Sequence, residues 1–252
     1  MAAVKPFICI RPRGEMAART AALPYDVYNR QEACEAVKGN PYSFLNIDRP
    51  ETQFPAEVDT YDDRVYELLD SQIKEGIYVT DPDPAYYLYE LTMDGRSQTG
   101  IVACCAVDDY INGVIKKHEN TREDKEQDRI RHVDATNAHT GPIFLAYRRQ
   151  EELKRLVEQA KKEKALYDFV SEDGIRHRVW KIGDPGMVKA VEEAFEKLPA
   201  AYIADGHHRA ASAVKAGLKR RQEKPDYTGK EPFNYFLSVL FPDDELMILP
   251  YN

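Results

Sequence analysis

Polar and apolar residues alternate in two parts of the chain, and an Asp-Gly pair interrupts each of them. These pairs are Asp94-Gly95 and Asp173-Gly174. An Asp-Gly pair lets both central residues of a tight turn take positive φ, which suits the turn of a two-stranded hairpin. The strands of the two predicted hairpins are residues 86–92, 99–107, 166–170 and 176–182.

Other segments carry the spacing of helices or of single strands. Asn29 with Glu32 three residues later is the pattern of a capping box, and Leu68 and Leu69 lie among charged residues at helical spacing. The predicted helices are residues 29–38, 62–74, 122–134, 151–164, 185–198 and 208–215. The predicted single strands are residues 7–12, 43–47, 142–147 and 201–204. Helices alternate with strands and hairpins, so we expect an α/β to α+β chain with a mixed sheet.

The length of 252 residues corresponds to one or two compact units. Pro and Gly are scattered along the chain and no repeat of domain size is visible, so any boundary between units is tight. Residues 247–252 form an apolar, strand-like run without a polar tail. We therefore expect the natural protein to continue beyond this point.

The charge balance argues against bulk binding of nucleic acid. Lys and Arg number 35 and Asp and Glu 43, which gives a net charge of -8. A surface of this sign repels a phosphate backbone, although a local basic pocket for a small anion is still compatible with it. No apolar run approaches the length of a membrane span or of a secretory signal, so we expect a cytoplasmic protein without a membrane partner.

The four cysteines show no metal-binding or redox spacing. They are Cys9, Cys34 and the adjacent pair Cys104 and Cys105. We expect reduced and mostly buried thiols.

The most informative segment is residues 202–212, where an apolar strand runs into Asp205-Gly206 and a helix rich in small residues follows at once. The start of such a helix directs backbone N–H groups and the positive end of its dipole to one point. Arg209 can add charged donors there. The alternative is that Asp205 only caps the helix while His207 and His208 fill the turn.

A second segment, residues 115–122, places a base, a carboxylate, a hydroxyl and a cation between an apolar stretch and a charged helix. These are His118, Glu119, Thr121 and Arg122. Charged loop residues are ordinarily only solvated. The segment gains meaning if it faces the loop of residues 205–209.

Five separated motifs resemble one uncharacterised bacterial and archaeal protein family, which is placed in the ParB/sulfiredoxin superfamily. In chain order they are ALPYDV at 22–27, NPYSFLNIDRPE at 40–51, KKHENTRE at 116–123, ATNAHTGPIFLAY at 135–147 and DGHHR at 205–209. The resemblance implies a ParB/sulfiredoxin-like core. It divides the chain into an N-terminal α/β region, 1–100, and a nucleotide-binding region, 101–252, that is truncated at its C-terminus.

Within that superfamily the sequence resembles the free-serine kinase branch most closely, through its His-Glu pair and its Asp-Gly-His-His-Arg loop. The resemblance implies that Glu119, with His118, takes the proton of a serine hydroxyl. Residues Asp205, Gly206, His207, His208 and Arg209 would hold the phosphates of ADP or ATP, together with Mg²⁺. Thr121 and Arg122 would contact the substrate.

Two other branches fit less well. Sulfiredoxins need a cysteine in the loop, where this chain has His207 after Gly206. ParB proteins add a basic DNA-binding face, which an acidic chain does not offer. The sequence therefore predicts a phosphotransferase for a small hydroxyl substrate, with a ParB-like nucleotidase or a nucleotide-sensing binding module as alternatives. Metal ligands and oligomeric state stay open.

Overall fold

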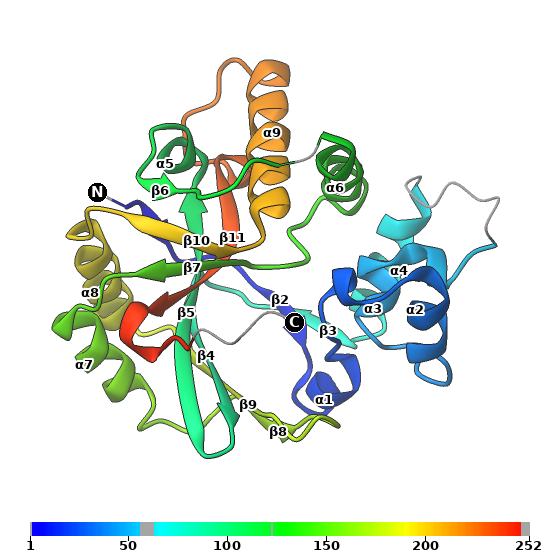
Figure 1. Ribbon diagram of the computed structural model, residues 1–252, viewed down its shortest axis with the longest axis horizontal. Helices are drawn as coiled ribbons and strands as arrows, with labels where there is room; N and C mark the ends of the chain where they lie inside the picture. The colour runs from blue at the N-terminus through cyan, green and yellow to red at the C-terminus, as the bar shows by residue number, and fades with distance from the viewer. Residues whose placement is uncertain (1, 56–62, 122, 248–252) are drawn as a thin grey trace.

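A large mixed sheet forms the centre of the molecule (Figure 1). The computed structural model describes residues 2–55, 63–121 and 123–247, and in this part of the chain the sheet has nine strands. In spatial order they are β6 (Ile115–Lys116), β10 (Ala201–Asp205), β7 (Ile143–Tyr147), β11 (Tyr235–Pro242), β5 (Arg96–Ala106), β4 (Tyr86–Met93), β9 (Arg176–Ile182) and β8 (Tyr167–Val170), with β1 (Val4–Lys5) beside β5. The pairs β6–β10 and β7–β11 are parallel and the others antiparallel, which confirms the predicted mixed sheet.

Both predicted hairpins are present. β4 pairs with β5 across Asp94 and Gly95, whose φ angles are 50° and 77°. β8 pairs with β9 across a turn in which Gly174 has a φ of 80°. Positive φ at these positions is the conformation that the Asp-Gly pairs favour.

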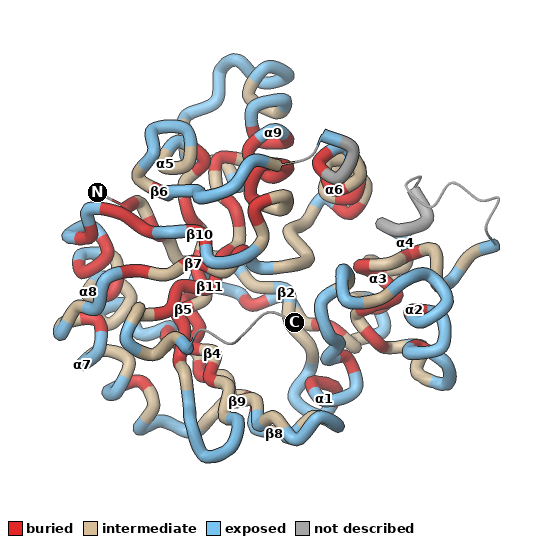
Figure 2. Tube along the Cα trace, viewed as in Figure 1, coloured by how far each residue is buried: buried red, intermediate tan, exposed pale blue. Residues whose placement is uncertain are grey.

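Helices cover the sheet and complete one main core. They are α5 (Val107–Ile111), α6 (Glu123–Thr136), α7 (Glu151–Ala160), α8 (Pro185–Glu196) and α9 (His207–Glu223). Along β7, buried Ile143, Leu145 and Tyr147 alternate with half-buried residues, and the ring of Tyr147 meets Phe195 of α8 edge to face. Figure 2 shows the buried residues gathered where these strands meet α8 and α9.

Residues 10–80 form a second group of elements, here called the helical lobe. It contains α1 (Ala17–Thr20), α2 (Arg30–Ala36), α3 (Leu45–Asp48), α4 (Asp63–Lys74) and a small sheet of β2 (Ile10–Pro12) and β3 (Tyr78–Thr80), with 3-10 turns at Gly14–Met16, Tyr25–Val27 and Pro50–Thr52. Its apolar residues make two small clusters apart from the main core. The capping box of Asn29 and Glu32 is present at the start of α2, as predicted.

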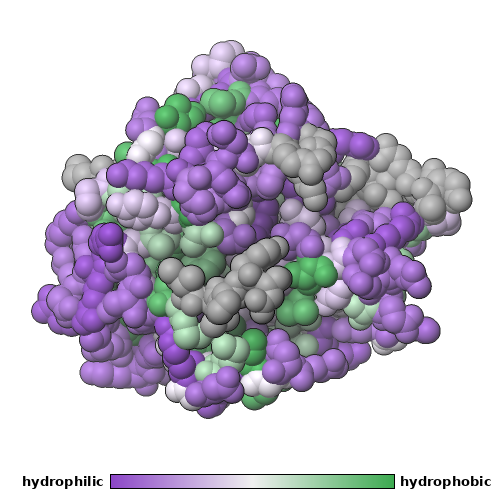
Figure 3. All heavy atoms as spheres, in the orientation of Figure 1, coloured by the Kyte–Doolittle hydropathy of each residue, from purple (hydrophilic) through white to green (hydrophobic). Residues whose placement is uncertain are grey.

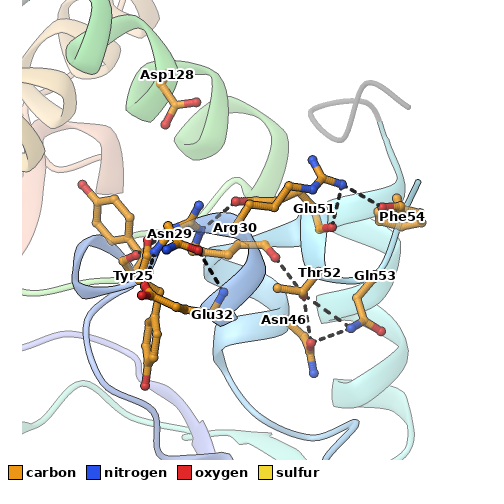
Figure 4. Close-up of polar contacts among 12 residues, drawn as sticks. Tyr25, Asn29, Arg30, Glu32, Asn46, Glu51, Thr52, Gln53, Phe54 and Asp128 are labelled. Carbon is orange, nitrogen blue, oxygen red and sulfur yellow. Dashed lines mark hydrogen bonds and ion pairs between the residues drawn. The ribbon is translucent and has the colours of Figure 1, made fainter. Parts of the chain in front are cut away.

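The strand predicted at residues 43–47 is wrong, because this segment forms the short helix α3. The amide of Asn46 donates to the carbonyls of Asn40 and Pro41 and accepts bonds from Thr52 and Gln53 (Figure 4). These local bonds stabilise a compact turn. A five-residue apolar pattern cannot by itself distinguish such a turn from a strand.

Several predicted boundaries also shift. The strand expected at residues 7–12 is regular only in β2, with a single bridge from Phe7 to Ala85, and α9 continues eight residues beyond Lys215. Residue 100, the limit between the two predicted regions, lies inside β5. A division of the chain into two regions stays a prediction. The strand-like end predicted at 247–252 lies, from residue 248 on, outside the described residues.

The surface agrees with the composition. Figure 3 shows hydrophilic residues over most of the visible face. None of the helices in the described ranges is long and apolar enough to cross a membrane.

Of the four cysteines, Cys105 is buried, Cys9 and Cys104 are half-buried and Cys34 is exposed, so the expectation of mostly buried thiols is wrong for Cys34.

Candidate functional site

The junction of β10 and α9 turns sharply at Gly206. Ala201 and Ile203 fix β10 in the core, and the helix begins at His207, directly after Gly206 with a φ of 89°. This left-handed conformation favours glycine. The N-cap glycine offers no side-chain acceptor to the first N–H groups of α9, so these donors face outward from the helix end.

Asp205 and Arg209 bind each other across this turn. Nη2 of Arg209 donates to Oδ2 of Asp205 at 2.7 Å, and Nη1 donates to the carbonyl of Pro142 at 2.8 Å. Asp205 therefore does not cap α9, so the capping part of the alternative interpretation is wrong. Two of the five N–H donors of Arg209 are engaged in these bonds.

The loop after β6 reaches the same place. β6 and β10 are parallel neighbours, with Ile115 opposite Ala201 and Lys116 opposite Tyr202. Parallel strands leave a sheet at the same edge, so the residues that follow both strands meet there. The two loops do face each other, which is the condition under which the segment of residues 115–122 gains meaning, although they are far apart in sequence.

Glu119 and His207 form the contact between these loops. Oε1 of Glu119 lies 3.0 Å from Nδ1 of His207, and the ring of His118 meets the ring of His207 edge to face with 4.4 Å between centroids. His207 is buried, whereas the Glu119 side chain is 52% exposed and open to a ligand. The Nδ1 edge of His207 and the carboxylate of Glu119 therefore lie within contact distance of each other.

Burial lowers the pKa of His207, and the nearby charge of Glu119 opposes this shift. The neutral imidazole is therefore the favoured form. Its Nε2 atom is buried and has no hydrogen-bond partner among the described residues. On the opposite side of the His207 ring, Nδ1 faces the carboxylate of Glu119.

The remaining predicted site residues have other surroundings. Thr121 donates to Glu126 of α6, which also pairs with Lys215 of α9, so Thr121 joins the loop to two helices. His208 lies in the first turn of α9 and is half-buried. Arg122 lies outside the described residues.

A small cavity of about 30 Å³ borders Arg209 on the side of the helical lobe. Besides Arg209 its polar lining includes Tyr25 and Asp48 of the lobe and Arg129 and Thr140 of the main body, and apolar side chains such as Ile143 also line it. The anion site was predicted at Gly206 and His207, and these two residues do not line this cavity. Its volume admits about two water molecules or one compact polar group.

Buried ionisable groups surround this cavity. Burial raises the pKa of Asp48, while a 2.7 Å bond from Thr140 and the charge of Arg129 oppose the shift. Burial lowers the pKa of His132 to about 3, so this ring is neutral. The guanidinium of Arg129 lies 4.1 Å above the ring of Tyr25.

The sequence motifs contained part of this information. Tyr25, Asp48 and Thr140 belong to three of the motifs quoted above, but spacing alone indicated no role for them. Arg129 and His132, three positions apart on α6, were missed. Polar residues on the buried face of a charged helix are the signal that could have identified them.

Arg49, also part of a quoted motif, holds the lobe together instead of facing a site. It donates to the carbonyls of Tyr25 and Tyr28 and pairs with Glu51. Arg30 adds bonds to the carbonyls of Glu51 and Phe54 (Figure 4). These contacts fix the turn that carries Tyr25.

Comparison with known proteins assigns nearly the whole chain to one protein family. Neither the curated proteins nor the solved structures contain a match to it. One family model, described as protein of unknown function (DUF1015), matches residues 4–252. Since this match covers nearly the entire chain, the protein belongs to the DUF1015 family.

Proposed function

We propose that the protein is a nucleotide-dependent phosphotransferase with a ParB/sulfiredoxin-like core, acting on a small hydroxyl substrate such as free serine. The observation that carries the proposal is the contact between Glu119 and His207. It brings an accessible carboxylate to the residue with which α9 begins. A phosphotransferase needs these two features together, a base for the acceptor and a site for the phosphates.

The phosphates bind at the start of α9. Gly206 leaves the first N–H groups without a side-chain cap, and the helix dipole favours negative charge there. Arg209 retains donors beyond those that bind Asp205 and Pro142. ATP or ADP is the phosphate donor, and Mg²⁺ binds mainly to its phosphate oxygens, as this ion prefers.

Glu119 takes the proton of the acceptor hydroxyl. Nδ1 of His207 lies 3.0 Å from one of its oxygens and so limits how the carboxylate can turn, while the exposed part of the side chain faces solvent. A base must come within hydrogen-bond reach of the hydroxyl that it activates. His118, whose ring packs on His207, supports this arrangement from the same loop.

The test measures binding and chemistry separately. Calorimetry with ATP and ADP gives nucleotide affinity, and phosphorus NMR with and without serine identifies the product. Glu119→Gln should lower turnover by roughly 10² to 10⁴ with little change in nucleotide affinity, because the variant keeps its shape but loses the base. Arg209→Ala should weaken nucleotide binding about tenfold or more. Glu172→Gln, at an exposed hairpin turn, is the matched control.

Three outcomes would contradict the proposal. Phosphate release that does not depend on an acceptor would support the nucleotidase alternative. Nucleotide binding without any product would support the sensing module. If the unmodified protein binds neither nucleotide, both the phosphate site and the phosphotransferase are wrong.

A further inference from the structure

Three side chains at the loop contact form a donor set for a metal ion. His118, Glu119 and His207 each offer one ligand atom, and these atoms all lie within 4.8 Å of one another. Two imidazole nitrogens and one carboxylate oxygen are a combination that holds zinc in proteins. A metal–ligand bond is about 2.0–2.2 Å long for these donors, so one ion can be reached by all three after small side-chain adjustments.

The scaffold holds the donors in place from two directions. His207 is 4% exposed and lies in the first turn of a long helix, so its ring is the fixed member. His118 and Glu119 are exposed and follow β6, which is paired with β10. A buried donor on one side and two exposed donors on the other leave the solvent side open for a water ligand.

The donor set also selects the class of ion. Mg²⁺ and Ca²⁺ prefer all-oxygen sites, whereas imidazole suits zinc and its neighbours among the divalent transition metals. We propose that His118, Glu119 and His207 bind one divalent transition-metal ion, such as Zn²⁺, with a fourth position open to water. This ion is distinct from the Mg²⁺ of the proposed function, although its ligands belong to the same loop contact, and its binding does not require a nucleotide.

Occupation of the site has a chemical consequence for Glu119. A divalent cation bound to a carboxylate stabilises its deprotonated form, so the carboxylate becomes a weaker base. The metal-loaded protein would therefore be slower in any reaction that uses Glu119 as a base. Metal binding and base catalysis therefore compete for the same carboxylate.

The direct test uses chelator-treated protein without nucleotide. Titration with Co²⁺ should produce the visible absorption of a four- or five-coordinate site at one ion per chain, and Zn²⁺ should abolish this absorption. Calorimetry gives the Zn²⁺ affinity. Millimolar Mg²⁺ should not displace the Co²⁺ signal, because the site is rich in nitrogen.

Variants assign the ligands. His118→Ala and Glu119→Gln should each raise the Zn²⁺ dissociation constant by about 30-fold or more, since loss of even a supporting contact typically costs about 10- to 100-fold. His208→Ala, beside His207 in the same helical turn, is the matched control and should change it less than about threefold. Both ligand variants alter exposed residues, so folding is not at risk.

The proposal is wrong if chelator-treated protein shows no Co²⁺ absorption and no Zn²⁺ binding. It is also wrong if His118→Ala and Glu119→Gln bind Zn²⁺ as tightly as His208→Ala does. These measurements contain no nucleotide, so their failure leaves the phosphotransferase proposal untouched. Absence of nucleotide binding would equally leave the metal result unchanged.

Discussion

Gly206→Ala tests how tightly the loop between β10 and α9 is packed. Gly206 has a φ of 89°, and a Cβ atom at this position would lie 3.1 Å from Nε of Arg209 and 3.2 Å from its Cζ and Nη2 atoms. The variant therefore carries two costs. One is the left-handed backbone of a residue with a side chain, and the other is the displacement of a guanidinium held by Asp205 and Pro142.

The first cost is about 1–2 kcal/mol for a residue with a Cβ atom. The second comes from a contact several tenths of an ångström closer than the ordinary carbon separation of roughly 3.5–4.0 Å. Moving Arg209 away weakens its hydrogen bonds, each of which contributes about 1 kcal/mol. The expected loss in the free energy of unfolding is therefore about 2–3 kcal/mol.

Gly95→Ala is the matched control. Gly95 has a similar φ of 77°, but no described atom lies within 4 Å of its Cβ position. This variant should lose only the backbone cost of about 1–2 kcal/mol. The difference between the two variants isolates the contact with Arg209.

Urea unfolding measures both variants, followed by circular dichroism and by the fluorescence of Trp180, the single tryptophan. A double-mutant cycle completes the test, since in an Arg209→Ala background Gly206→Ala should cost no more than Gly95→Ala. Equal losses for Gly206→Ala and Gly95→Ala in the unmodified background would refute the reasoning about Arg209.

Two further predictions concern buried charge and thiol reactivity. Burial alone would raise the pKa of Glu90, but the bonds from Lys161 and Arg178 outweigh it and lower the pKa below 4.5. This stabilisation is therefore present above about pH 4.5 and is lost as the pH falls through the folded-state value. Urea unfolding should show that Glu90→Gln costs about 2–4 kcal/mol at pH 7 and less at pH 3.5, and an equal cost at both pH values would contradict the assignment. A chromogenic disulfide reagent should react first with exposed Cys34. Cys105 is buried and has a raised pKa, so it should react only after unfolding. The folded Cys34→Ser protein should therefore be labelled slowly, and rapid labelling of it would contradict the prediction.

Local sequence signals predicted the elements that depend on local chemistry. The two hairpins follow from Asp-Gly turns, and the start of α2 follows from its capping box. The junction at Gly206 was also predictable, because glycine between an apolar strand and a helix rich in small residues indicates a sharp turn.

Elements that depend on distant partners were not predictable in this way. β11 lies inside the sheet and is apolar on both sides of a single buried Ser238, so it has too little alternation to identify it as a strand. β6 has only two residues and exists because β10 lies beside it. The contact between Glu119 and His207 depends on this short pairing, so local sequence patterns did not indicate it. Only the resemblance to the free-serine kinase branch, with its His-Glu pair and its Asp-Gly-His-His-Arg loop, pointed to it.

The cavity beside Arg209 depends on the relation between the helical lobe and the main body. Polar contacts between the two sides include the bond from Thr140 to Asp48 and the stacking of Arg129 on Tyr25, while Ala138 packs against an apolar cluster of the lobe. The apolar clusters of the lobe are separate from the main core. Separating polar surfaces exposes groups that water can hydrate, so opening this boundary costs less free energy than separating apolar surfaces of equal area. The phosphotransferase proposed above would need a boundary that opens to admit substrate and closes to exclude water, and Arg209, which lies at the start of α9, also lines the cavity at this boundary.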